Sequence, residues 1–150
     1  METIEITIDR SAVMEEVAKA TDYTGSKMDD SSDDIRDRIL MTDAAQSDLG
    51  RFWDESAMAV NENFKEMLVS DSRDATCYQC TLEVSKSFDK ALTPSVASTL
   101  KSYFIASIIG QWFKFANKSE ATDYFSTAAE LLLGAERILY VRRKPTIPTD

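Results

Sequence analysis

Two segments of the chain alternate apolar and polar residues, the pattern of a strand with one buried face. Segment 3–8 has its apolar positions at Ile4, Ile6 and Ile8, and segment 76–86 has them at Tyr78, Cys80, Leu82 and Val84. Because isolated strands are only marginally stable in water, they need each other and a covering layer. We therefore predict a small two-stranded β-ribbon, in which residues 2–8 pair with residues 76–86.

The remaining apolar residues recur at helical spacing. Three long helices are predicted: one opens at Asp43 or Ser47 and runs to about Ser70, one runs from Thr93 to about Asn117, and one begins at Ser119 and ends near Arg142. Thr93 provides a capping hydroxyl and Pro94 suits the first helical position. Two shorter helices are expected, one capped by Asp9 or Ser11 and ending at Thr24-Gly25, the other over 35–41, after an acidic loop at 26–34.

These elements predict a mainly α fold, a bundle of three long helices with shorter helices and the β-ribbon. The helix that starts at Thr93 is apolar on most sides from Tyr103 onward, so we expect it to lie at the centre. No repeat or linker divides the chain. Residues 1–144 should form a single helical domain, and residues 145–150 an extended C-terminal tail.

Composition agrees with a folded domain and restricts the partners. The chain has 150 residues, 43% of them hydrophobic, and a formal net charge of −9. The charge is uneven, since residues 1–92 carry a net −11 and residues 93–150 a net +2. Nucleic acids are bound mainly through Lys and Arg, so a specific nucleic-acid function is disfavoured and a basic partner surface is favoured.

No segment indicates a membrane or secretory destination. The most apolar stretch, 102–116, is shorter than the roughly 20 residues that a membrane span needs and is interrupted by Gly110, Gln111 and Lys114. The N-terminus has no basic start followed by an apolar run. We expect a cytoplasmic protein.

Catalytic chemistry has little support in the sequence, and we predict that the protein is not an enzyme. The chain contains no histidine, which excludes the Ser-His-Asp and Cys-His mechanisms. Cys77 and Cys80 have the spacing of a redox or zinc motif, but no further Cys or His completes a zinc site. In a strand the two thiols point to opposite faces, so one buried and one near-surface cysteine is the preferred interpretation.

Other sites also lack their required residues, and we predict no metal and no cofactor. Asp29, Ser31 and Asp33 resemble the start of a calcium-binding loop, but Asp34 stands where Gly is required and Leu40 where Glu is required. A solvated acidic loop is the favoured interpretation, with cation binding left open. No glycine-rich phosphate-binding loop occurs.

One segment is suited to contact another chain. The C-terminal residues Arg142, Arg143, Lys144, Pro145 and Pro148 combine positive charge with prolines, which favour an extended conformation that docks into a partner's groove. The alternative is a frayed terminus whose charges only cap the preceding helix. Deletion of residues 142–150 distinguishes the two interpretations. It should abolish assembly if the tail is a docking segment, and it should leave assembly unchanged if the tail is a frayed terminus.

Several short motifs, spread over almost the whole chain, are shared with a known family: Thr7-Ile8-Asp9-Arg10-Ser11-Ala12-Val13, Glu16-Val17-Ala18-Lys19, Tyr23-Thr24-Gly25, Phe52-Trp53, Ala91-Leu92-Thr93-Pro94-Ser95, Gly110-Gln111-Trp112-Phe113-Lys114-Phe115 and Tyr140-Val141-Arg142-Arg143-Lys144-Pro145. In these motifs and their order the chain resembles a family of small prophage-encoded virion structural proteins of gut anaerobes, and a member of that family would be assembled into the virion. The resemblance implies a head-to-tail connector or tail-completion subunit that forms rings and contacts portal or tail proteins. It transfers no catalytic residue.

Three functions follow from these observations. The first is a non-enzymatic virion structural subunit, which is expected to form homo-oligomers. The second is a monomeric binding or inhibitor protein that sequesters a basic partner. The third is an enzyme that uses carboxylates or a cysteine, and it requires a concave polar site with strongly shifted groups. Light scattering after size exclusion distinguishes the first from the second.

Overall fold

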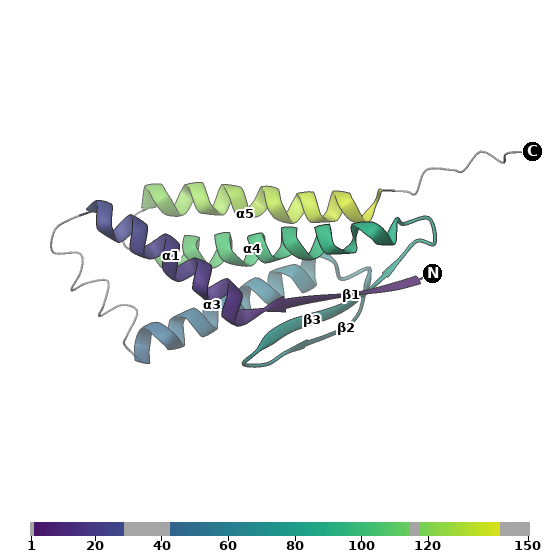
Figure 1. Cartoon of the computed structure of the whole chain (residues 1–150), viewed down its shortest axis with the longest axis horizontal. Coiled ribbons are helices and arrows are strands. Elements are labelled where there is room, and N and C mark those ends of the chain that lie inside the picture. The colour runs from purple at the N-terminus through teal and green to yellow at the C-terminus, as the bar shows by residue number, and fades with distance from the viewer. Residues whose placement is uncertain (1, 29–42, 115–117, 142–150) are drawn as a thin grey trace, which may run out of the picture.

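A computed structural model describes residues 2–28, 43–114 and 118–141, and the side chains of residues 2–21, 47–114 and 118–141. The fold is mainly α, with four helices and a small antiparallel sheet in the described residues (Figure 1). The elements, in chain order, are β1 (Glu2–Asp9), α1 (Arg10–Met28), α3 (Asp43–Asn63), β2 (Leu68–Arg73), β3 (Cys77–Val84), the 3-10 turn η1 (Lys90–Leu92), α4 (Thr93–Phe113) and α5 (Lys118–Leu139). No helix in these ranges is long and apolar enough to cross a membrane.

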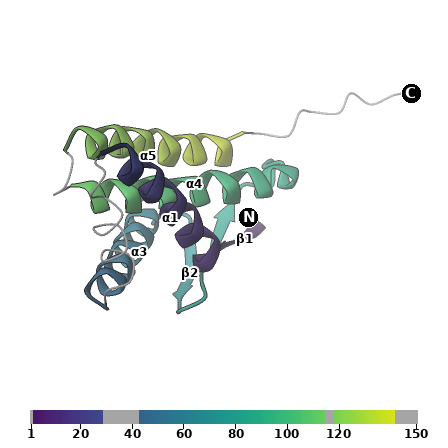
Figure 2. The ribbon, with the colours of Figure 1, turned by 60° about the vertical axis from the view of Figure 1, so that its left-hand side comes forward.

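The sheet has the strand order β1-β3-β2, and β3 pairs antiparallel with both neighbours. The predicted pairing of residues 2–8 with 76–86 is confirmed, with Ile6 opposite Cys80 at its middle. Ile4, Ile6 and Ile8 are all buried, as their alternation predicts. The helices cover this apolar face, and the other face of the sheet is turned to solvent (Figure 2).

Helix α4 lies at the centre, as its apolar composition predicts. It packs against α5, α1, α3 and β1, and it begins directly after η1. Phe104, which is fully buried, contacts the rings of Trp53 and Tyr78 with centroid distances of 4.8 and 5.5 Å. A buried hydroxyl pair also joins α3 to α4, since Ser56 Oγ donates to Ser107 Oγ at 2.8 Å. Aromatic packing and this hydrogen bond fix α3, α4 and the sheet together.

The prediction of a two-stranded ribbon is wrong, because β2 adds a third strand. The sequence predicted that the helix starting near Asp43 continues to Ser70, whereas α3 ends at Asn63 and a turn leads into β2. Phe64 is buried just after the end of α3, so its apolar position continued the helical spacing and did not reveal where the helix ends. All residues of β2 after Leu68 are exposed, and a strand without a buried face gives no alternating pattern.

The helix lengths also differ from the predicted division into three long and several short helices. The four helices are of similar length, with 19, 21, 21 and 22 residues. Helix α1 continues through Thr24-Gly25, where a stop was predicted, to Met28. Thr93 is not a capping residue, since η1 runs directly into α4 and gives Thr93 helical angles. Asp9 does cap α1, with its Oδ1 accepting from the Ser11 N–H at 3.2 Å.

Candidate interaction surface

The cysteine pair is placed as the strand alternation predicts. Cys80 lies in the core, and Cys77 is half-buried on the opposite face of β3. Burial raises the pKa of the Cys80 thiol and so disfavours the reactive thiolate. Within the described ranges, no three residues among Cys, Asp and Glu come together as metal ligands. The acidic loop 29–34 lies outside the described residues.

Two shallow hollows lie among the described residues. One, of about 220 Å³ between α3, α4 and α5, is lined by Arg51, Phe52, Glu55, Gln111, Lys114 and Phe125. The other, of about 200 Å³, lies beside the end of β1 and is lined by Thr7, Ile8, Asp9, Ala12, Ala97, Ser98 and Lys101. Both are smaller than a typical ligand pocket of roughly 300–1,000 Å³. In the described chain no hydrogen bond joins Ser98 to Lys101, so this pair lacks the contact by which a base activates a hydroxyl.

The outer edge of β1 carries backbone groups that no strand in the described ranges pairs with. Arg10 N–H donates to Thr76 O at 3.0 Å, which continues the β1–β3 register by one residue. Hydrogen-bonded pairs alternate in an antiparallel ladder, so Ile4, Ile6 and Ile8 bond inward to β3. The N–H and C=O groups of Thr3, Glu5 and Thr7 must therefore point outward.

The opposite side of β3 confirms this alternation. Glu83, which faces Thr3 in the register, donates its N–H at 2.7 Å to Met67 O, at the start of β2. The odd-numbered residues of β3 thus bond toward β2 and the even-numbered ones toward β1. The residues of β1 whose backbone groups point outward, Thr3, Glu5 and Thr7, are also those whose side chains lie on the solvent face of the sheet. β1 therefore presents a regular, accessible edge.

The solvent-exposed face of the sheet is acidic. It carries Glu5 and Asp9 from β1 and Glu83 from β3, among threonine, serine and glutamine side chains. None of its strand residues is Lys or Arg. The neighbouring Glu2 belongs to the other face and is paired with Lys90 at 3.3 Å. A strand added to the edge of β1 would therefore lie along a negative surface.

The second edge of the sheet, β2, differs from β1. Its pairing with β3 is shifted between Leu68 and Ser70 by a bulge. Two of its side chains are tied to α3, because Asp71 accepts from Asn61 at 3.0 Å and Arg73 donates to Asp54 O at 3.0 Å. Bulges, lysine and proline are devices that protect an edge strand from further pairing. β1 has none of these three, and the charged residues that it carries are all acidic.

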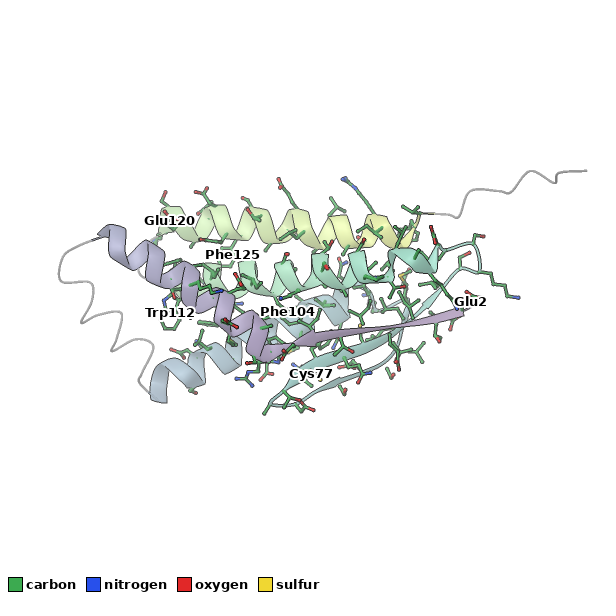
Figure 3. The ribbon with its side chains drawn as sticks, viewed as in Figure 1. Glu2, Cys77, Phe104, Trp112, Glu120 and Phe125 are labelled. Carbon is green, nitrogen blue, oxygen red and sulfur yellow. The ribbon has the colours of Figure 1, made fainter. Side chains whose placement is uncertain are left out.

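The predicted partner-binding residues Arg142, Arg143, Lys144, Pro145 and Pro148 lie outside the described residues. The chain before them is described, and it ends with Tyr140 and Val141, whose side chains are 55% and 45% exposed. Figure 1 shows that the end of α5 and the start of β1 lie at the same end of the molecule, and Figure 3 shows Glu2 there. The structure thus places the attachment point of the tail but not the tail.

The sequence predicts the paired strands but not which edge of the sheet is free. The alternation in residues 3–8 identifies the two faces of β1. It does not show whether β1 is an edge strand or a central strand, because both can have the same alternation. The exposed β2 gave no signal at all. The only clue to the free edge was the absence of Lys and Pro from residues 2–9, which is meaningful only once β1 is known to be an edge.

No protein-family model matches this chain, and no curated protein or solved structure matches it either.

Proposed function

We propose that this protein is a non-enzymatic structural subunit of the phage type, a head–tail connector or tail-completion protein that acts through protein–protein contacts. The free edge of β1 is the observation that carries the assembly role. An extended segment of another chain can bond to Thr3, Glu5 and Thr7 without breaking any bond to β3. The sequence resemblance supplies the more specific connector role, with portal or tail proteins as candidate partners.

The surface charge supports contacts with protein and not with nucleic acid. Residues 1–92 carry a net −11, and the exposed sheet face carries carboxylates without a basic strand residue. Such a surface repels a phosphate backbone. In a connector, the same charge would let DNA pass along the subunits without binding.

The test is the mass of the full chain by size exclusion with light scattering, over a wide range of protein concentration. A structural subunit should give a ring or an oligomer whose mass rises with concentration. Isolation of assembled particles should then recover the chain with portal or tail proteins. A strict monomer at high concentration, with no particle association, would contradict this function.

A second function is favoured by one observation, the acidic sheet face with Glu5, Asp9 and Glu83. A monomeric binding protein could use this face to sequester a basic partner, and electrostatic attraction would speed the encounter. Here the expected result is a monomer that binds a basic protein, with an affinity that falls steeply as salt is added. Replacement of Glu5 and Glu83 by Gln should weaken that binding.

A further inference from the structure

We infer that residues 141–146 of one copy dock as an antiparallel strand on the free edge of β1 of a second copy. This inference rests on the proposed assembly function and names its contact surface. The occupant is the C-terminal segment Val141-Arg142-Arg143-Lys144-Pro145-Thr146. Four features support this docking: the position of the proline in the tail, the charge of the sheet face, the hollow beside β1 and the position of α5.

The proline decides which tail residues bond to β1. In an added strand, alternate residues direct their N–H and C=O groups toward the neighbouring strand. Pro145 has no N–H, so its position must point away from β1. The inward residues are then Arg142, Lys144 and Thr146, whereas Pro148 lies on the inward parity and ends the pairing.

The charge of the two strands then selects the antiparallel direction. In an antiparallel pair, the inward tail residues lie opposite Thr7, Glu5 and Thr3, so that Lys144 faces Glu5 on the acidic face of the sheet. Arg142 lies opposite Thr7, next to Asp9. In a parallel pair the inward residues would align with the isoleucines instead, and the basic side chains would face the apolar side.

The hollow beside β1 accommodates the residue that precedes the basic pair. With Lys144 opposite Glu5, Val141 lies opposite Ile8 and its side chain points toward the helix-covered side of the sheet. The hollow of about 200 Å³ beside this end of β1 is lined by the apolar residues Ile8, Ala12 and Ala97 and by the polar residues Thr7, Asp9, Ser98 and Lys101. Val141 is 45% exposed, so its apolar surface becomes buried on docking.

The position of α5 requires that the docked segment comes from a second copy. The end of α5 and the start of β1 lie at the same end of the molecule (Figure 1), so a tail folding back on its own β1 would run parallel to it. The antiparallel register instead places Arg142 opposite Thr7, about 17 Å along the strand from Glu2 at roughly 3.4 Å per residue. A contact between unlike surfaces of identical copies is head-to-tail and generates rings or filaments.

The first experiment is a charge exchange in the full chain, followed by sedimentation equilibrium. Glu5→Lys and Lys144→Glu should each weaken self-association about tenfold, because each replaces an attraction by a repulsion. The double variant should restore it. Glu130→Lys makes the same change of charge at an exposed position on α5 and should leave association unchanged.

The second experiment tests strand pairing independently of charge. Thr146→Pro removes an inward N–H and should weaken self-association about tenfold, whereas Ile147→Pro removes an outward one and should have little effect. Both substitutions lie beyond the described fold and leave β1 untouched. Equal effects of the two prolines, or no rescue in the charge exchange, would overturn strand addition.

The outcomes also separate this inference from the function on which it rests. An oligomer that forms normally in all these variants would overturn docking on β1 and leave the assembly function standing. A full chain that is monomeric at every concentration would overturn both. Excess peptide of residues 140–150 should dissociate the oligomer, and an oligomer that resists the peptide would count against this docking site.

Discussion

Two glycines in the C-terminal helix pair illustrate how a single residue sets the fit between elements. Gly110 on α4 lies under the ring of Phe125, and a Cβ added there would be 2.9 Å from two carbons of that ring. Gly134 on α5 has no atom within 4 Å of such a Cβ. The absence of a side chain at position 110 therefore allows α5 to pack closely on α4, while at position 134 it only reduces helix stability.

The substitutions Gly110→Ala and Gly134→Ala should consequently have opposite effects. We expect Gly110→Ala to lower the free energy of unfolding by about 1–2 kcal/mol through overpacking. Gly134→Ala should raise it by about 0.4–1 kcal/mol, since alanine reduces the entropy of the unfolded chain. Urea denaturation measures both values.

A third variant identifies the cause at position 110. In a Phe125→Ala background, Gly110→Ala should lose its penalty, because the ring that it collides with is gone. A penalty of the same size in both backgrounds would show that the Phe125 ring is not responsible.

Strand β3 shows how much an element's pattern determines by itself. Its alternation predicted which side chains are buried, and the structure confirms this for Tyr78 and Cys80. Pairing with β2 was not predicted, because β2 is joined to β3 by a turn that the exposed flanking residues do not reveal. Asp74 holds this turn with its Oδ1, which accepts from the Thr76 hydroxyl and from the N–H groups of Thr76 and Cys77. These hydrogen bonds lower the pKa of Asp74, and the one from the Thr76 hydroxyl has the largest effect.

The two cysteines provide a direct test of the alternation in β3. We consider a disulfide reagent that releases one detectable thiolate for each cysteine it modifies. In the native protein this reagent should modify Cys77 rapidly. Cys80 is 1% exposed and burial raises its pKa, so it should react only when the sheet opens. The release traces should show one fast and one slow thiol.

Cys77→Ser is the matched control for this assignment. The variant should retain only the slow phase, and in denaturing urea its one thiol should react at once. Two fast thiols in the native wild-type protein would contradict the burial of Cys80.

At the scale of the molecule, the helices differ in how many elements hold them. Helix α4 is surrounded by α1, α3, α5 and β1, whereas α5 packs mainly on α4. Of the buried side chains of α5, three are alanines (Ala121, Ala128 and Ala135) and one is Leu139, whereas its larger apolar residues, such as Tyr124 and Leu131, are only partly buried. A helix attached through one face in this way is a candidate for local opening while the rest stays folded.

Amide hydrogen exchange should therefore distinguish the two helices. We expect the amides of α5 to exchange through a local opening, faster than those of α4 and β3, whose exchange should approach the rate set by global unfolding. Mass spectrometry of peptides from the exchanged protein measures this difference. Equal protection in α4 and α5 would contradict an independent opening of α5.

The sequence by itself determined the features that depend on local periodicity and residue type. The alternation in residues 3–8 and 76–86 gave two strands and their buried faces, the apolar character of α4 gave its central position, and the missing histidines excluded a set of mechanisms. Only the tertiary structure decided that α3 stops at Asn63, that β2 joins the sheet and that β1 has a free edge. These features depend on which segments meet in space. Exposed residues such as those of β2 have no apolar periodicity from which such a contact could be predicted.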